Sequence, residues 1–255
     1  KAAGLYMICT MSKHAAEANL FVSHAWQYTC GSLVAALQHW AKKSGTDPAT
    51  TYAWIDLSSV NQHVSADVSQ DEWAETFKNG IAKAGRVVLV LTPWSDPIPY
   101  TRAWCLWEVF NASQTGARFE IALSAEEEQR LGDAVREDPF GIVPALCEIS
   151  SSKATAKDPG DLAMITSWSE RPSSEGGAGG YVRLGGLLLD LMRAWIPEVL
   201  EQIKQERSPD GKWEGDKERI LFRACLALTY NKLGRYREAL ELQEAVLGAP
   251  STASW

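Results

Sequence analysis

An apolar run followed by a proline-rich loop and a helical pattern constrains the fold most. Residues 86–92 (RVVLVLT) have the length and β-branched content of a strand buried on both faces of a parallel sheet. The three prolines of the loop 93–100 prevent the strand from continuing, and Thr101 is a suitable N-cap for a new helix. The apolar stripe that we expect to face the core is formed by Ala103, Leu106, Trp107 and Phe110.

Glu108 falls outside this stripe, one helical turn after Trp104 and on the same flank of the predicted helix. In open α/β sheets, ligands bind beyond the carboxyl ends of the strands, which is where such a helix begins. The pair is therefore either an aromatic plate and a carboxylate that line a site, or a solvated Glu beside a half-buried Trp. The spacing leaves both interpretations open.

The rest of the first 150 residues alternates between the same two patterns. Further strands are predicted at 19–23, 51–57, 119–123 and 142–149, and helices at 32–43, 71–84 and 124–136. Such alternation predicts an α/β domain over residues 1–150, with a parallel sheet and helices on both faces. Neither G-x-G-x-x-G nor G-x-x-x-x-G-K-[ST] occurs, so the classical dinucleotide fold and the P-loop fold lose their main support.

The pattern changes after residue 150. Residues 151–216 are predicted to form a linker and helical extension, with a short helix at 161–168 and a Gly/Ser-rich segment at 169–180. Residues 217–249 predict two amphipathic helices that join at Gly234. The spacing of Leu226, Ala227, Tyr230, Gly234, Tyr236 and Ala239 resembles a tetratricopeptide repeat of the kinesin-light-chain-like variety. One repeat cannot bury its own face, so we expect an array that continues beyond it; a plain helical hairpin is the alternative.

Composition excludes several classes of function. The net charge is -7 and no block of Lys and Arg occurs, which argues against nucleic-acid binding. The five cysteines are scattered without a C-x-x-C, and the four histidines lack ligand spacing, so we expect reduced thiols in a cytoplasmic protein and no metal site. No stretch approaches the about 18 consecutive apolar residues of a membrane span.

Three stretches in order resemble the Toll/interleukin-1 receptor (TIR) homology domain over about residues 19–149. They are Phe21-Val22-Ser23-His24, Trp54-Ile55-Asp56 and Trp104-Cys105-Leu106-x-Glu108. The resemblance implies a flavodoxin-like sheet of five parallel strands in the order 2-1-3-4-5. It also implies self-association through this domain.

The resemblance implies two possible activities. Some TIR domains are scaffolds, whereas others cleave NAD+ at the nicotinamide–ribose bond, and the Glu of W-C-L-x-E is essential in the cleaving members. That position is Glu108 here. Loss of neutral nicotinamide leaves an oxocarbenium-like ribose that a carboxylate can stabilise, so NAD+ would be a substrate and no cofactor or metal is implied. Trp104 would pack against the nucleotide, and Ser23 and His24 would line the cleft.

Two further residues join the candidate site with open roles. Arg102 is either a partner for a substrate phosphate or a surface charge. Asp56 ends a predicted strand and is a candidate for substrate contact. A carboxylate at this place can also be a phosphoacceptor, and a capping or loop-fixing role is the stronger alternative.

Two hypotheses follow for an intracellular signalling module. In the first, the chain is a TIR-like NAD+ glycohydrolase that is activated when the repeat array binds a ligand. In the second, it is a non-catalytic adaptor that assembles through its TIR-like domain and binds proteins through its repeats. The second is motivated by Ala25-Trp26 and Arg102, which stand where plant-type members often carry a basic residue and a Ser.

Overall fold

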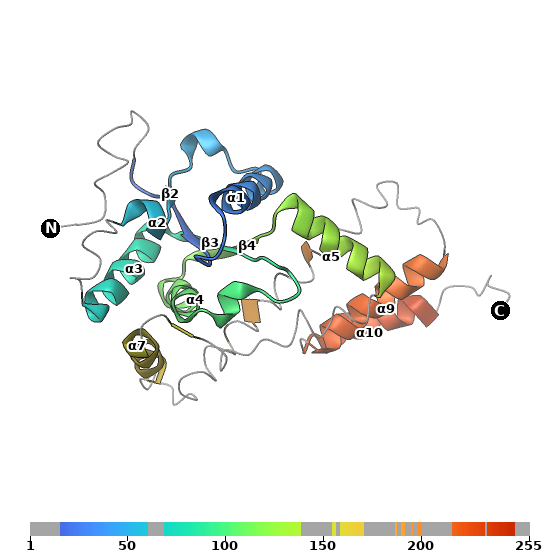
Figure 1. Cartoon of the computed structure of the whole chain (residues 1–255). Helices are drawn as coiled ribbons and strands as arrows, with labels where there is room; N and C mark the ends of the chain where they lie inside the picture. The colour runs from blue at the N-terminus through green and yellow to red at the C-terminus, as the bar shows by residue number, and fades with distance from the viewer. Residues whose placement is uncertain are drawn as a thin grey trace. The chain divides into compact units, whose positions relative to one another are not determined.

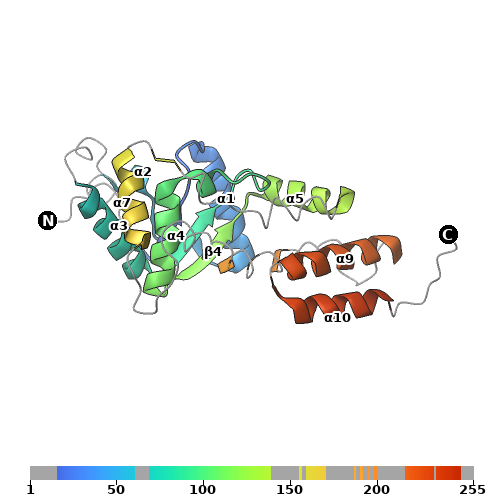
Figure 2. The ribbon, with the colours of Figure 1, turned by 90° about the horizontal axis from the view of Figure 1, so that it is seen from below.

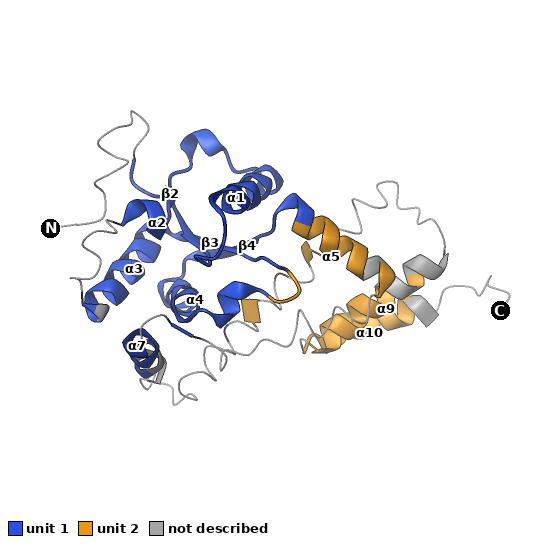
Figure 3. Ribbon diagram, in the orientation of Figure 1, with its two compact units in different colours: residues 1–93, 97–126, 150–187 blue, residues 94–96, 127–149, 188–255 orange. Residues whose placement is uncertain are grey.

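The chain forms two compact units, shown in Figure 3. The computed structural model describes residues 16–60, 69–138, 155–156, 159–170, 216–232 and 234–247, and six single positions between 187 and 199. The first unit comprises residues 1–93, 97–126 and 150–187, and the second comprises residues 94–96, 127–149 and 188–255.

The first unit is built on a parallel sheet. Its strands are β1 (Leu20–Ser23), β2 (Ala53–Trp54), β3 (Arg86–Val90) and β4 (Arg118–Ala122), in the order β2-β1-β3-β4. All three strand pairs are parallel, as predicted. The fifth strand predicted at 142–149 lies outside the described residues, so the order of a five-stranded sheet remains a prediction.

The second strand is shorter than its sequence pattern indicates. Residues 51–57 were expected to be extended up to Asp56, but β2 has two residues, and Asp56 begins the short helix α2 (Asp56–Ser59). The Asp56 carboxylate accepts a hydrogen bond from the backbone N–H of Leu57 at 2.7 Å. A carboxylate at a helix start is favourable because the free N–H groups there carry partial positive charge, which explains the early end of the strand.

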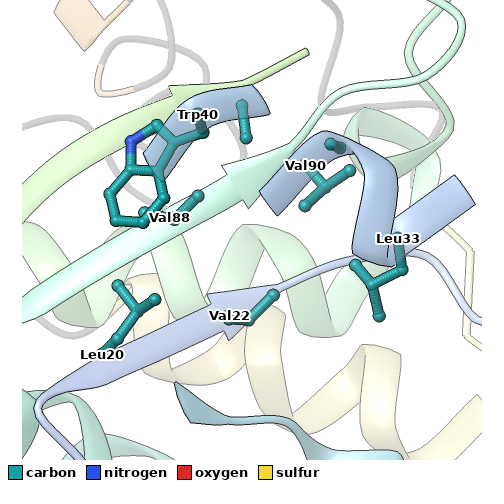
Figure 4. Close-up of a cluster of buried hydrophobic side chains, with 8 residues drawn as sticks. Leu20, Val22, Leu33, Trp40, Val88 and Val90 are labelled. Atoms are coloured by element: carbon teal, nitrogen blue, oxygen red, sulfur yellow. The ribbon is translucent and has the colours of Figure 1, made fainter. Parts of the chain in front are cut away.

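Helices cover both faces of the sheet (Figures 1 and 2). Helix α1 (Cys30–Ser44) packs on β3 and β4 on one side. The short helix η1 (Pro48–Thr50) follows it in the chain. Because successive strand residues point to opposite faces, β1 and β3 each contribute alternate residues to this side. The resulting core cluster, drawn in Figure 4, consists of Leu20, Val22, Leu33, Ala36, Trp40, Val88, Val90 and Ala122.

The opposite face is covered by α3 (Gln70–Ala84) and α4 (Ala103–Thr115). Aromatic residues dominate this layer. Phe21 stacks on Trp54 with ring centroids 4.6 Å apart, and Phe77 of α3 meets the ring of Trp54 edge-on at 5.2 Å. Helix α3 starts in a capping box in which Ser69 and Glu72 satisfy each other's backbone N–H groups.

The start of α4 is held by a distant segment rather than by Thr101. Thr101 was predicted to be the N-cap, but it ends the short helix η3 (Ile98–Thr101), and Arg102 precedes α4 without a side-chain cap. Thr155 pairs with the backbone here: Ala103 donates to its carbonyl at 3.0 Å, and its N–H donates to the carbonyl of Thr101 at 2.8 Å. The prediction of a Thr101 cap was therefore wrong.

Helix α7 (Pro159–Glu170) packs against α3 and α4. It overlaps the helix predicted at 161–168, which the sequence assigns to the linker and extension. Its Ile165 is 1% exposed. By its contacts α7 belongs to the first unit, because it covers a side of α4 that the sheet leaves open.

The second unit contains a helical hairpin at the predicted position. Helix α9 (Asp216–Lys232) packs along α10 (Tyr236–Leu247), and Gly234 adopts a φ of 76° in the turn between them. Only a residue without Cβ enters this left-handed conformation at little cost. The buried residues of the hairpin include Cys225, Leu226, Ala227, Tyr230 and Ala239. Helix α5 (Ala125–Glu137) contributes its Glu127 to this unit, where the carboxylate accepts from the backbone N–H of Trp94 at 2.8 Å.

Each helix in the described part of the chain is too short or too polar to cross a membrane.

Replacing Phe77 by Ala should lower the free energy of unfolding of the first unit by about 3–5 kcal/mol, because its ring joins the aromatic layer from β1 to α4. Chemical denaturation followed by circular dichroism measures this change. The matched control is Leu57→Ala, whose side chain is exposed and should change stability by less than about 0.5 kcal/mol. A loss below about 1 kcal/mol for Phe77→Ala would show that the aromatic layer is not a cooperative core.

Candidate functional site

The candidate site lies where β1 and β2 end and α4 begins. Ser23, the last residue of β1, donates its hydroxyl hydrogen bond to a carboxylate oxygen of Glu108 on α4. Strand alternation explains the contact, because Ser23 shares the α3 and α4 face of the sheet with Phe21, two residues earlier. Its partner in the register of β3 is Leu89. The site thus lies at the carboxyl ends of the strands, as expected, and it joins two residues that are 85 positions apart in the sequence.

Glu108 is buried rather than solvated. Only 6% of its surface is exposed, and every residue from Cys105 to Ala112 is buried. The expected single apolar stripe is therefore incomplete as a description of α4. The sheet contacts the helix on one side, while α3, η3 and α7 contact it on others. The interpretation of Glu108 as a solvated surface residue was wrong.

Burial makes the neutral acid the favoured form of Glu108. Removal of the carboxylate from water raises its pKa well above the usual range, and the negative charge of Asp56 raises it further. The hydrogen bond from Ser23 and the positive charge of Arg102 oppose this rise in pKa. The desolvation effect is the largest, so Glu108 holds a proton over a wider pH range than an exposed Glu.

His24 and Asp56 form a second polar pair beside Glu108. The Nε2 atom of His24 lies 3.6 Å from Oδ1 of Asp56, and among the described residues it has no hydrogen-bond partner. Burial lowers the pKa of His24, although the neighbouring Asp56 carboxylate acts in the opposite direction. The imidazole is therefore neutral at pH 7, and its Nε2 is a buried atom without a hydrogen-bond partner among the described residues.

Asp56 is also held by the loop that follows β1. Its second carboxylate oxygen accepts a hydrogen bond from the indole N–H of Trp26. With the Leu57 N–H on the other oxygen, both oxygens of Asp56 are engaged in fixing local structure. This geometry supports the predicted loop-fixing role of Asp56, and it also keeps the carboxylate beside His24.

Cys105 is a member of the cluster that the sequence pattern did not single out. Its Sγ lies one turn before Glu108 and donates to the backbone carbonyl of His24 at 3.3 Å. Burial, followed by the charge of Glu108, raises the pKa of the thiol well above its usual value. The thiol is therefore protonated, and it ties α4 to the end of β1. Only the W-C-L-x-E motif signalled its position.

Trp104 lies on the same helix but has different neighbours. Its ring stacks on Phe77 with centroids 5.1 Å apart, and its indole N–H donates to Asp161 of α7 at 2.9 Å. The side chain is half-buried. Phe77 therefore covers one face of the Trp104 ring, and Asp161 occupies its polar edge. This is the ring that was expected to pack against a nucleotide.

Arg102 is half-buried, and it acts on the cluster through its charge. It lowers the pKa values of Glu108, His24 and Cys105. Among the described residues its guanidinium makes no hydrogen bond or ion pair, whereas its backbone forms a bridge with Thr155. A free guanidinium at the edge of the site is compatible with the predicted phosphate contact.

The structure thus brings Ser23, His24, Asp56, Arg102 and Glu108 together, whereas it packs Trp104 between α3 and α7. Within the described ranges, no group of three or more His, Cys, Asp or Glu side chains is arranged to hold a metal ion. What the cluster offers is a proton-holding carboxyl, a neutral imidazole and a fixed carboxylate in one place.

Comparison of the chain with protein families, with characterised proteins and with solved structures gave no match.

Replacing Glu108 by Gln should stabilise the fold increasingly as the pH rises. An unfolded Glu titrates near about 4.3, whereas the folded pKa is higher, so the parent chain loses stability between those two values. The advantage of Glu108→Gln should therefore grow by about 1.4 kcal/mol per pH unit above about pH 4.3, until the folded pKa is reached.

Denaturant titrations from pH 4 to pH 8 measure this difference. Glu75→Gln is the control, because it makes the same change of side chain at an exposed position of α3. An advantage of Glu108→Gln that shrinks as the pH rises would mean that the fold prefers the ionised carboxylate.

Proposed function

We propose that the chain is a TIR-like NAD+ glycohydrolase that cleaves the nicotinamide–ribose bond, with Glu108 as the key carboxylate. The observation that carries this proposal is the buried pairing of Glu108 with Ser23 at the carboxyl edge of a parallel sheet. Buried carboxyl groups with raised pKa values are unfavourable for stability, and they are concentrated at functional sites. In α/β folds this edge is also where ligands bind.

The reaction requires little from the protein beyond charge and position. The C–N bond between ribose and nicotinamide breaks, and its electron pair leaves with nicotinamide, which becomes neutral. The ribose ring is left as an oxocarbenium ion, and water adds to it, releasing a proton and ADP-ribose. A carboxylate beside the ring stabilises the positive charge or holds the ribose hydroxyls.

The protonated state of Glu108 in the free protein fits a cationic substrate. A neutral acid in an apolar setting becomes easier to ionise when a positive charge enters beside it. The nicotinamide ring of NAD+ carries such a charge. Substrate binding would thus favour transfer of the Glu108 proton to water, which leaves the carboxylate in place before the C–N bond breaks. Ser23 stabilises the ionised form by its hydrogen bond, and Arg102 adds a positive charge that suits a substrate phosphate.

His24 and Asp56 complete the proposed site. The unpartnered Nε2 of His24 is a hydrogen-bonding atom for a ribose hydroxyl or for the attacking water. Asp56 keeps the imidazole beside it and adds negative charge near the cationic ring. Trp104 is less suited to substrate contact than its place in the motif suggests, because Phe77 and Asp161 engage it.

The second candidate function is that of a non-catalytic adaptor, and two observations favour it. Glu108 is 6% exposed, and Trp104 is packed into the unit, as expected for a domain that keeps the motif for structure. In the second unit, α10 exposes Tyr236 and Leu240, at 69% and 55%, which supports stacking of a further repeat or binding of a protein ligand. Self-association and a cytoplasmic signalling role belong to both candidates.

The direct test is nicotinamide release from NAD+ by the purified chain at high protein concentration. Glu108→Gln should reduce release by at least about 100-fold, because it removes the charge that stabilises the oxocarbenium ion. Glu75→Gln should retain parental turnover, and circular dichroism checks that each variant is folded. If neither parent nor variant releases nicotinamide, even when tethered in clusters on a surface, the adaptor function replaces the enzymatic one.

The pH dependence of kcat/KM gives a second test. Glu108 must be ionised to act, so activity should rise with pH along a limb whose midpoint lies above the ordinary Glu value of about 4.3. Ser23→Ala removes a hydrogen bond that lowers the pKa of Glu108, so it should move this limb to higher pH. A limb that moves to lower pH, or stays in place, would contradict the assignment of Glu108 as the titrating group.

A further inference from the structure

An aromatic side chain stands exposed beside the candidate site. Trp26, in the loop that follows β1, is 50% exposed. Indole rings are normally buried, because few side chains gain more from leaving water. Trp26 is three residues beyond Ser23, so its exposure occurs at the edge of the sheet where Glu108 and His24 lie. A large apolar surface left in water at this place suggests a ligand that covers it.

The Trp26 ring is exposed to solvent, but a hydrogen bond fixes its position. Its indole N–H donates to one oxygen of Asp56, whose other oxygen accepts from Leu57 and lies 3.6 Å from His24. The polar edge of the ring is therefore directed at the site. No aromatic ring or guanidinium in the described part of the chain packs on Trp26, in contrast to Trp104, which stacks on Phe77. The loop thus presents a ring fixed by one edge, with its apolar surface available.

Arg102 places a positive charge near Glu108 and His24, but the charge in direct contact with Trp26 is negative and favours a cation. Asp56 is in direct contact with its edge, while burial lowers the pKa of His24 and so keeps the imidazole uncharged at pH 7. The face of an indole carries negative electrostatic potential and attracts cations, most strongly when water is excluded. A flat, positively charged ring satisfies the aromatic surface and the neighbouring carboxylate together.

We infer that Trp26 is the residue that stacks against the cationic nicotinamide ring of the substrate and makes the site prefer NAD+ to NADH. The inference rests on the proposed function, because it names the residue that selects the reacting ring in that site. Stacking there holds the ring next to Asp56, while the ribose bond lies toward Ser23 and Glu108. Trp26 acts on binding, so its contribution is separable from cleavage.

The experiment is calorimetric titration of NAD+ and NADH into the full chain carrying Glu108→Gln, which slows turnover during the measurement. The two nucleotides share adenine, ribose and phosphates, and they differ in the charge and planarity of the nicotinamide ring. Trp26→Ala should raise the Kd for NAD+ about tenfold and change the Kd for NADH less than about twofold. Trp26→Phe, which keeps a ring but loses the bond to Asp56, should give an intermediate Kd for NAD+. Leu57→Ala is the matched control, because it truncates an exposed apolar side chain that follows Asp56 in the sequence and should leave both Kd values unchanged.

The outcomes separate this inference from the proposed function. Equal NAD+ affinity with and without Trp26, or an equal loss for NAD+ and NADH, would overturn the assignment of Trp26 to the cationic ring. The assignment would also be overturned if NAD+ bound neither the chain with Glu108→Gln nor the chain that retains Glu108. If binding depends on Trp26 as expected but the chain with Glu108 releases no nicotinamide, Trp26 is retained as the ring-binding residue and the glycohydrolase proposal fails.

Discussion

The pairing of β1 with β3 is the interaction on which the rest of the first unit depends. It places Ser23 beside Leu89 in the centre of the sheet, and β2 and β4 then pair on the two outer sides. Because all pairs are parallel, the polar residues that follow β1 and β2 come out at one edge. Helix α4 begins near that edge and lies on the Phe21 face. The contact between Ser23 and Glu108, and the approach of His24 to Asp56, follow from this arrangement.

The burial of Glu108 is unfavourable for the stability of this arrangement. A carboxyl group that leaves water loses solvation, and a single hydroxyl hydrogen bond does not replace it. Natural sequences replace such groups easily by apolar ones when only packing matters, and they retain them where function requires a strained or charged centre. Cys105 and Arg102 add to this centre without neutralising it, since the thiol is protonated and the guanidinium makes no direct bond to Glu108 in the described part of the chain.

The two tryptophans near the site have surroundings that their sequence positions do not predict. Trp104 belongs to the W-C-L-x-E motif, yet its ring completes the aromatic layer of Phe21, Trp54 and Phe77 and its N–H bonds to α7. Trp26 belongs to no predicted element, yet it remains half-exposed with one edge fixed by Asp56. The difference arises from α7, which packs against α3 and α4, the two helices that carry Phe77 and Trp104.

Local patterns in the sequence determined the alternation of strands and helices, the parallel sheet and the C-terminal hairpin, because periodicity and the Gly234 turn act over a few residues. They also placed Ser23 at the end of a strand, Asp56 at the boundary of an element and Glu108 in the first half of a helix. Tertiary structure alone decided that Glu108 is buried, since a helical period cannot reveal that α4 has neighbours on several sides. It also decided that Thr155, rather than Thr101, supports the start of α4, because the two segments that pair are more than fifty residues apart. The close approach of His24 to Asp56 and the fixing of Trp26 have the same origin: each joins the ends of separate strands, and no spacing along the chain encodes which strands are neighbours.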